Sequence, residues 1–454
     1  MVSVFWFRRD LRLADNPALL RALDEGAGEV VPLFTLDRRL WEPAGDVRRA
    51  YLNASLRALD ESMSGALHVR RGDPTETVVA VARSAGASSV HASADTAPYG
   101  RRRDAGVERA LVEAGIGFVR TGCAYAVPPG SVRTKQGTPY SVFTPFSRAW
   151  REHGWPEPAP APSQARWAAP QGESDALYAD PDLGDLALPE AGESAAMRRW
   201  ADFRDAGDGG LEGYKERRDR PDLAGTSTLS HHLKWGEVHP RTLLADLSGH
   251  DGPGATTFTT ELAWREFYAD VLWHHPDSAR QYYRAEFATM AYDRPDDLVE
   301  AWRDGRTGYP FVDAGMRQLR SEGWMHNRLR MVVASFLVKD LHVEWQVGAR
   351  HFMRWLRDGD VASNSHGWQW AAGSGTDAAP YFRVFNPVTQ GLRFDPSGDY
   401  VRRYVPELRH LPGKSAHEPW DADDGYAHGY PTRIVDHAEE RREALRRYEG
   451  VTGR

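Results

Sequence analysis

Cysteine is almost absent from this chain: Cys123 is the only one among 454 residues. A single thiol excludes an intrachain disulfide, a four-cysteine zinc site and an iron–sulfur cluster held by this chain's own thiolates. Lysine is also scarce, because only five of the 57 basic residues are lysines and the rest are arginines. Anion binding by this chain therefore relies on guanidinium groups, whose planar fork grips phosphates.

The chain also lacks an excess of positive charge and any long apolar run. Its net charge is −7, so a nucleic-acid-binding face has to be local. No apolar stretch reaches the length of about 20 residues that crosses a membrane, and the first residues do not form a signal peptide. The sequence predicts a cytoplasmic protein without membrane contact.

The first part of the chain alternates two kinds of segment. Short apolar runs at 2–7, 30–36, 67–69 and 88–93 have the composition of strands, and helical periodicity lies between them. This alternation predicts an α/β domain over 1–128, with a parallel, Rossmann-like sheet covered by helices on both faces. The glycine fingerprint of dinucleotide-binding folds is missing. Ligands of such sheets still gather at the carboxyl ends of the strands.

The rest of the chain has a different character. Residues 129–195 are predicted to form an interdomain linker, because the stretch PEPAPAPSQARW and its neighbours are rich in proline and alanine. Residues 196–454 show 3.6-residue periodicity in four long segments and are predicted to form a mostly α-helical domain. The polar end of the chain, after about residue 420, is expected to be peripheral.

The stretch DGDVASNSHGWQW (358–370) combines two acids, an amide and two indoles. A calcium loop is excluded, because Ala362 and Ser363 occupy positions that need an oxygen ligand and a glycine. A hydrolase site with two carboxylates remains a possible interpretation. However, Asp358 and Asp360 are followed by an amide and indoles, and not by a clear partner acid farther along the chain. A redox site explains more, since a flavin ring needs a nearby amide and acceptor, and tryptophan passes electrons through protein.

Three further segments have side chains at helical or capping spacing. Glu261, Trp264, Arg265 and Tyr268 share one helix stripe, which suits either a cavity wall or a solvated surface. Asn327, Arg330 and Met331 share another face, on which Arg330 could pair with a distant acid. The hydroxyls of GTSTLS (225–230) suit a phosphate cradle or a simple helix cap. The adjacent His231 and His232 point apart on a helix, so no metal site is expected.

Taken in order along the chain, these segments resemble one family, the photolyase/cryptochrome flavoproteins. The resemblance covers nearly the whole chain and rests on FWFRRDLRLADNPAL, GTSTLS, ELAWREFY, GYPFVDAGMRQL, GWMHNRLRM, FLVKDL, DGDVASNSHGWQW and YFRVFNPVTQG. The chain is most similar to class I photolyases that act on cyclobutane pyrimidine dimers. This resemblance implies an α/β antenna domain, a long linker and a helical domain that holds FAD.

The resemblance assigns roles around FAD. The residues that it places at the cofactor are Tyr214, Thr226, Ser227, Thr228, Leu229, Ser230, Phe258, Arg330, Asp358, Gly359, Asp360 and Asn364. It places Asn364 at flavin N5, pairs Arg330 with Asp358, and makes Trp368 and then Trp345 electron donors to the flavin. Tyr292 occupies the usual place of the outermost tryptophan. A phenol is harder to oxidise unless it loses its proton, so either Tyr292 or another aromatic residue ends the chain of donors.

The resemblance also assigns the DNA and antenna contacts. The residues matching the dimer pocket are Glu261, Trp264, Asn327, Met331 and Trp370, where indoles could hold a flipped-out lesion by stacking. Those matching DNA contacts are Arg218, Arg265, Arg328, Arg383 and Gln390. The antenna residues are Arg9, Arg48, Asp95 and Lys234. Lys234 favours 8-hydroxy-5-deazaflavin over methenyltetrahydrofolate.

The expected function is therefore light-driven repair of pyrimidine dimers in UV-damaged DNA by a monomer, with electron transfer from excited reduced FAD. A cryptochrome photoreceptor is the alternative, disfavoured by Asn364 and by the short tail after Trp420. A nucleotide-binding flavoprotein without light chemistry is a third hypothesis. It leaves Glu261, Trp264 and Trp370 unexplained together.

Overall fold

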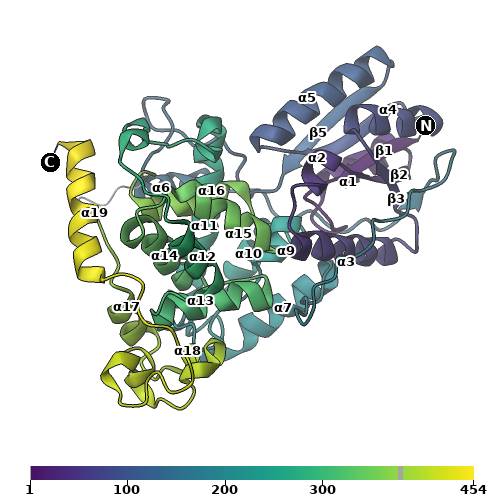
Figure 1. Cartoon of the computed structure of the whole chain (residues 1–454). Helices are drawn as coiled ribbons and strands as arrows, with labels where there is room; N and C mark the ends of the chain where they lie inside the picture. The colour runs from purple at the N-terminus through teal and green to yellow at the C-terminus, as the bar shows by residue number, and fades with distance from the viewer. Residues whose placement is uncertain (1, 377–381, 454) are drawn as a thin grey trace.

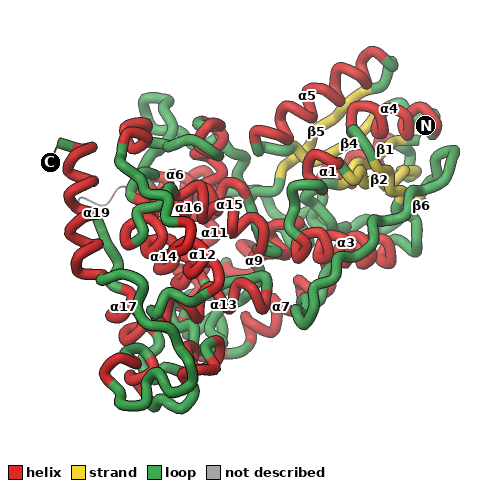
Figure 2. Tube along the Cα trace, viewed as in Figure 1, coloured by secondary structure: helices red, strands yellow, loops and turns green. Residues whose placement is uncertain are grey.

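The computed structural model of the protein describes residues 2–376 and 382–453. Its strands are confined to the N-terminal domain, at the upper right of Figure 2, whereas helices form nearly all of the rest. The predicted combination of an α/β domain and a helical domain is confirmed.

The N-terminal sheet is parallel, with strand order β3-β2-β1-β4-β5 and a short sixth strand beside β2. The strands are β1 (Ser3–Phe7), β2 (Glu29–Leu36), β3 (His68–Arg71), β4 (Ser89–Ala94), β5 (Gly117–Cys123) and β6 (Arg166–Trp167). The helices of this domain are α1 (Pro17–Glu25), α2 (Arg38–Trp41), α3 (Asp46–Ser62), α4 (Pro74–Ser84) and α5 (Pro98–Glu113).

Strand β1 explains why this sheet is covered on both sides. Successive side chains of a strand point to opposite faces. Phe5 and Phe7 pack with α1 and α3 in one core, while Val4 and Trp6 pack with α4 and α5 in the other. An uninterrupted apolar run is what a strand buried on both faces requires.

Besides the short α2 and β6, two longer elements of this domain were not predicted. Strand β5 lies at the edge of the sheet and is mostly half-exposed, so it has no continuous apolar run. Helix α5 is rich in arginine and buries only four of its residues, among them Val107 and Leu111. Both escaped prediction because little apolar surface is needed at those positions.

The helical domain surrounds a second group of cores, and Figure 1 shows its elements from teal to yellow. Its helices are α6 (Phe143–His153), α7 (Glu193–Asp205), α8 (Tyr214–Arg217), α9 (Ser230–Trp235), α10 (Pro240–Leu247), α11 (Pro253–His274), α12 (Asp296–Asp304), α13 (Pro310–Glu322), α14 (Asn327–Ser335), α15 (Trp345–Trp355), α16 (Val361–Ala372), α17 (Pro387–Phe394), α18 (Asp399–Tyr404) and α19 (His437–Thr452). Among the described residues, seven short 3₁₀ or π helices complete it: η1 (Gly207–Gly209), η2 (Pro276–Ala279), η3 (Ala285–Thr289), the π-helical η4 (Phe336–Asp340), η5 (Pro406–Leu408), η6 (Gly413–Ala416) and η7 (Pro419–Asp421).

The predicted linker 129–195 is not wholly a linker. Helix α6 lies inside it, and Phe146 and Trp150 of that helix are buried in the core of the helical domain. The indole N–H of Trp150 donates to the buried carboxylate of Glu266 at 2.6 Å. Only the stretch that follows α6, up to α7, has the extended character that its proline content indicates.

The end of the chain is also more integrated than predicted. The Tyr430 side chain is 3% exposed, and its hydroxyl donates to Asp313 at 2.6 Å. Helix α19, yellow in Figure 1, then packs along η4 and η3. Polarity misled the prediction, because α19 is held mainly by ion pairs rather than by apolar burial.

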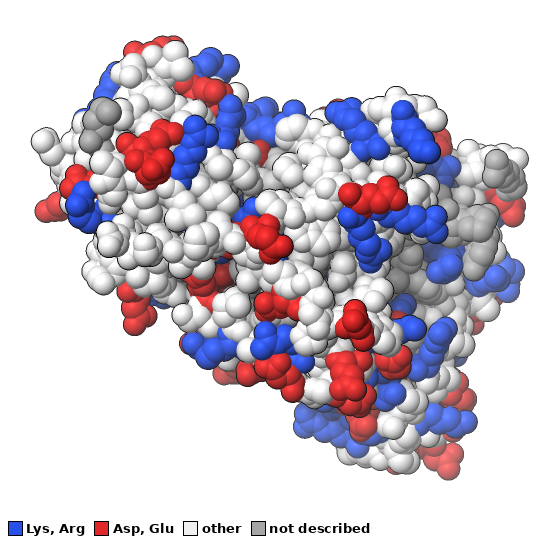
Figure 3. Space-filling view, turned by 180° about the vertical axis from the view of Figure 1, so that it is seen from behind, with Lys and Arg blue, Asp and Glu red and all other residues white. Residues whose placement is uncertain are grey.

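The surface has no dominant charge on the face shown in Figure 3, where basic and acidic side chains are interspersed. Such a surface agrees with the net charge of −7 and leaves phosphate binding to local arginines. Within residues 2–376 and 382–453, no helix combines the length and the apolarity needed to cross a membrane.

Candidate functional site

Helix α16 lies at the centre of the candidate site, packed against α11, α14 and α15 (Figure 1). Most of α16 is buried, but Asn364, Gly367 and Trp370 are half-exposed and lie about one turn apart on it. A Cβ atom added to Gly367 would meet no atom within 4 Å. This face of the helix therefore borders open space inside a helical core.

The loop before α16 holds a buried ion pair. Arg330 of α14 donates from Nη2 to Oδ2 of Asp358 at 2.7 Å, as the sequence predicted, and its Nε donates to the carbonyl of Met325 at 2.8 Å. Burial alone would raise the pKa of Asp358, but the charge and hydrogen bond of Arg330, together with Ser230 and Arg357, more than offset it and lower the pKa. Among the described residues, no group donates to the other buried oxygen, Oδ1. A ligand donor is therefore needed there.

The segment 225–230 lies beside this carboxylate, because the Ser230 hydroxyl is close enough to lower the pKa of Asp358. Thr228 adopts a positive φ of 52°, which is unusual for a β-branched residue. None of the hydroxyls caps α9, so the simple capping interpretation is wrong. The segment is shaped instead by Arg199, which donates to the carbonyl of Ser227 at 2.8 Å and to the Thr228 hydroxyl at 2.9 Å.

The amide of Asn364 is oriented by α15. Its Nδ2 donates to the carbonyl of Ala349 at 3.0 Å. The amide oxygen is then left to accept a hydrogen bond on the open face of α16, which suits a ligand that carries an N–H group.

Asp360, a predicted flavin contact, already has two partners within the protein. Its Oδ1 accepts from the backbone N–H of Ser363 at 3.1 Å and so caps α16. Its Oδ2 pairs with Arg9 of the N-terminal domain at 2.6 Å. The carboxylate turns toward the domain interface because it starts the helix, and it joins the two domains.

Two other predicted cofactor contacts act indirectly. Phe258 is 4% exposed and packs under Tyr214, with ring centroids 5.3 Å apart, so it supports that residue from the core. A Cβ at Gly359 would lie 2.7 Å from Nη1 of Arg48, so the glycine permits a close approach of α3. Leu229 is likewise buried in the core, and Thr226 is half-exposed in the loop.

Together these groups fit FAD. The unpartnered oxygen of Asp358 and the amide oxygen of Asn364 offer acceptors to a flavin ring, and Gly367 leaves room for its face. The hydroxyls and backbone of 226–230 offer donors to phosphates.

The predicted lesion residues lie on α16 and on α11 and α14, which both pack against α16. Glu261 and Trp264 are half-exposed on α11, and the Trp264 ring stacks on Phe143 with centroids 3.6 Å apart. Burial raises the pKa of Glu261, although the charge of Arg218 opposes the shift. Asn327 and Met331 share a face of α14, where Asn327 Nδ2 lies 4.0 Å from the Met331 sulfur. Trp370 is half-exposed beside Phe385.

The predicted DNA contacts do not all face the same way. Arg218 pairs with Glu261, Arg328 pairs with Asp219 at 2.7 Å, and Gln390 on α17 is half-exposed. Arg383 is exposed directly after the gap in the described residues, which includes Tyr381 of the matched segment YFRVFNPVTQG.

Arg265, a predicted DNA contact, has two backbone acceptors. Its guanidinium donates to the carbonyls of Ala124 at 3.0 Å and Leu233 at 3.1 Å and so connects the two domains. The signal for this role was absent from the sequence, because the contacted residues lie more than 30 positions away.

The aromatic residues form a path from the core to the surface. Trp368 is 2% exposed and lies over Gly348 of α15, where a Cβ would meet the indole at 2.0 Å. Trp345 lies one turn away on α15 and contacts Tyr282, with centroids 6.3 Å apart. Tyr282 in turn stacks on Tyr292 at 6.0 Å. The sequence prediction missed Tyr282, which stands between the predicted donors Trp345 and Tyr292.

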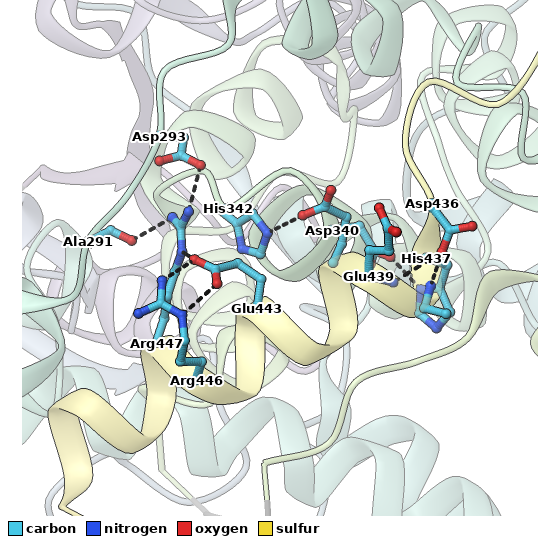
Figure 4. A network of polar contacts seen from close by, with 12 residues as sticks. Ala291, Asp293, Asp340, His342, Asp436, His437, Glu439, Glu443, Arg446 and Arg447 are labelled. Carbon is cyan, nitrogen blue, oxygen red and sulfur yellow. Dashed lines mark hydrogen bonds and ion pairs between the residues drawn. The ribbon is translucent and has the colours of Figure 1, made fainter.

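The backbone on either side of Tyr292 is clamped by α19 (Figure 4). Arg447 donates to the carbonyl of Ala291 at 2.9 Å and to the carboxylate of Asp293 at 2.9 Å. Glu443 holds the same guanidinium at 2.6 Å, and Asp293 donates its N–H to His342 at 2.9 Å. The C-terminal helix therefore fixes the outer end of the aromatic path.

A second cavity opens at the carboxyl ends of β1, β4 and β5. It lies where the strand order reverses between β1 and β4, the usual ligand position in such sheets. Its lining residues are Arg8, Arg9, Asp10, Ser93, Ala94, Asp95, Thr96, Ala124 and Tyr125.

The four predicted antenna residues relate to this cavity in different ways. Arg9 and Asp95 line it. Lys234 is half-exposed next to Arg9, whose Nε donates to the Lys234 carbonyl at 3.4 Å, and loss of hydration, with help from the charge of Arg9, lowers the pKa of Lys234 to about 7. Arg48 is not among the lining residues: it donates to the carbonyls of Met353 and Leu356 and connects α3 with α15, so its assignment to the antenna stays a prediction.

The fold and the site define a two-domain FAD-binding protein. Residues 3–163 match the DNA photolyase family, and residues 258–450 match the FAD binding domain of DNA photolyase. The chain is 40% identical to the deoxyribodipyrimidine photo-lyase of Halobacterium salinarum, with 100% of both chains covered. It therefore belongs to the DNA photolyase family.

Three solved structures share the whole fold. A bacterial class III photolyase from Agrobacterium tumefaciens has a TM-score of 0.92 and 37% identity, covering 100% of this chain and 98% of that one. An archaeal photolyase from Sulfolobus tokodaii, solved with two FAD molecules, has a TM-score of 0.86 and 29% identity over 99% and 100%. A cryptochrome from Synechocystis has a TM-score of 0.89 and 27% identity over 98% and 98%.

Proposed function

We propose that this protein is a deoxyribodipyrimidine photo-lyase that repairs cyclobutane pyrimidine dimers in DNA under blue light. Reduced FAD supplies the electron that light drives onto the dimer, while the chain binds and orients both. The observation that carries the proposal is the arrangement on α16, where Asn364, open space at Gly367 and Trp370 follow one another from the flavin site to the lesion mouth.

Glu261 acts at the pyrimidine edge. Its carboxyl can hydrogen-bond the pyrimidine edge, and the raised pKa makes it easier to protonate as negative charge builds on the lesion. Trp264 and Trp370 hold the apolar rings of the flipped dimer by stacking, and Asn327 and Met331 close the same pocket. The dimer thus leaves the base stack for a site made of both apolar and hydrogen-bonding surface.

Repair is favoured over photoreception by Asn364 and by the intact set of lesion residues. The class I assignment is part of this proposal, and the segment WMHNRLRM supports it against enzymes specific for the (6-4) lesion.

A repair assay tests the proposal. Purified protein with chemically reduced FAD would be mixed with single-stranded DNA that contains thymine dimers, in the dark and under blue light. We expect thymines to be recovered only in the light. An absence of light-dependent recovery would favour the cryptochrome alternative.

The aromatic path supplies electrons that keep the flavin reduced, and we place Tyr282 and Tyr292 at its outer end. Burial raises the pKa of Tyr282 to about 12 and that of Tyr292 further. Both phenols are therefore protonated at neutral pH, and each must lose a proton when it loses an electron. A phenol pair close to the surface can pass that proton to water.

Replacing Tyr282 by phenylalanine should slow light-driven flavin reduction by about tenfold, equivalent to about 1.4 kcal/mol of barrier. The bleaching of oxidised flavin under constant blue light measures the rate. Tyr283→Phe is the matched control, because Tyr283 is the next residue along the chain and contacts His275 instead. Equal rates for the two variants would remove Tyr282 from the path.

The cavity at the strand ends holds the antenna, which we assign as 8-hydroxy-5-deazaflavin. Arg9 places positive charge in the cavity wall, and Lys234 lies next to Arg9, which suits a ligand with an acidic ring hydroxyl. The absorption spectrum of the purified protein separates the candidates. Deazaflavin absorbs near the violet–blue boundary, methenyltetrahydrofolate absorbs in the near ultraviolet, and a second FAD doubles the flavin content.

A further inference from the structure

Four charged residues form a chain across the mouth of the lesion site. Glu261 on α11 pairs with Nη1 of Arg218. The Nε of Arg218 lies 3.9 Å from Oδ1 of Asp219, and Oδ2 of Asp219 accepts from Arg328 of α14 at 2.7 Å. Negative and positive charges alternate along this row of four side chains. The row connects Glu261, predicted to bind the lesion, with Arg328, predicted to bind a DNA phosphate.

Arg328 is held in place by more than this ion pair. Its guanidinium carbon lies 4.2 Å above the ring of Phe394, and its side chain is 15% exposed. The neighbouring His326 adds no charge at neutral pH, because burial lowers its pKa to about 4. The four side chains therefore sum to zero charge, and a DNA phosphate has to compete with Asp219 for Arg328.

Arg218 is the member that can change partners, since it lies within 4 Å of both Glu261 and Asp219. When a dimer takes Glu261 as its hydrogen-bond partner, Arg218 is released toward Asp219. Asp219 is then compensated, and Arg328 can turn to a phosphate without leaving an unpaired acid. With undamaged DNA the pocket stays empty, so Arg218 remains paired with Glu261. A phosphate that binds Arg328 then leaves the Asp219 carboxylate without a cationic partner.

We propose that Asp219 is a specificity-determining residue, which couples occupation of the lesion pocket to phosphate binding by Arg328. This inference rests on the proposed repair function. Because electrostatic contacts supply nearly all non-specific DNA binding, a carboxylate that weakens them in the absence of a lesion raises selectivity.

The test compares binding of undamaged and dimer-containing duplexes, by fluorescence anisotropy at fixed low salt. Asp219→Asn should tighten binding to undamaged DNA by about fivefold, the order expected for one screened unit charge. Binding to dimer DNA should change less than twofold, so the selectivity ratio falls. Asp219→Glu keeps the charge and should retain most of the selectivity.

Two controls make the outcome specific. Glu108→Gln removes the same charge from an exposed pair with Arg120 at 2.9 Å, in the other domain, and should leave both affinities unchanged. In an Arg328→Gln background, Asp219→Asn should no longer tighten binding to undamaged DNA. An equal gain in both backgrounds, or an equal gain on both DNAs, overturns the inference. If the wild-type protein shows no light-dependent repair, the proposed function itself fails, whatever Asp219 does.

Discussion

Replacing Trp368 by phenylalanine is expected to slow light-driven reduction of oxidised FAD by about 100-fold, equivalent to about 2.7 kcal/mol of barrier. Phenylalanine is much harder to oxidise than tryptophan, and Trp368 is the buried indole on the helix that carries Asn364. Repair by enzyme reduced chemically beforehand should persist, because the electron for repair does not pass through this indole. Flavin bleaching and dimer repair, measured on the same preparation, separate the two effects.

Trp302 provides the matched control for this variant. It is fully buried and contacts Trp368 with centroids 6.1 Å apart, but its indole N–H is fixed on the carbonyl of Val333 at 3.0 Å. Trp302→Phe leaves a comparable cavity and should reduce its flavin at nearly the wild-type rate. If Trp302→Phe is slow and Trp368→Phe is fast, the direction of the path is wrong.

Replacing Arg330 by leucine is expected to destabilise the protein by about 3–5 kcal/mol and to release FAD, because it leaves the charge of Asp358 buried without a partner. Thermal unfolding and the flavin content after gel filtration measure the two effects. Arg320→Leu breaks a pair of similar length, 2.8 Å to Asp304, on an exposed part of α13 and should cost less than about 1 kcal/mol.

Acidification should reproduce part of the Arg330 effect. The pKa of Asp358 is lowered in the folded state, so its contribution to stability is fully present above the unfolded pKa of about 4 and is lost as the pH falls below it. Arg330→Leu should therefore lose less stability between pH 7 and pH 3 than the wild-type protein. A similar loss in both would show that the ion pair is not the source.

The elements that the sequence predicted well are those with strong periodicity. Strands β1 and β2 and helices α11 and α14 bury continuous or stripe-like apolar surface, so their pattern is unambiguous. The pairing of Arg330 with Asp358 also followed from the motifs, and the structure confirms it.

Other features depended on contacts between distant parts of the chain. The partners of Asp360 and Arg265 could not be predicted from the sequence. In the structure, both side chains contact the N-terminal domain. Tyr282 lies in no motif, and it joins the aromatic path only because α15 brings Trp345 to it. The hydropathy pattern did not predict the packing of helix α19, because polar contacts of Arg447 and Glu443, and not an apolar stripe, hold the helix in place.

The ion pair at the start of α16 has a consequence for the proposed antenna. Asp360 begins the helix against Arg9 in the wall of the cavity at the strand ends, and Trp370 stands at its other end. Twelve helical residues span about 18 Å, and a helix packed on three neighbours resists bending. Resonance energy transfer depends steeply on the separation and mutual orientation of two chromophores. For a pigment held in that cavity, this rigid helix would help to fix both quantities relative to the flavin site.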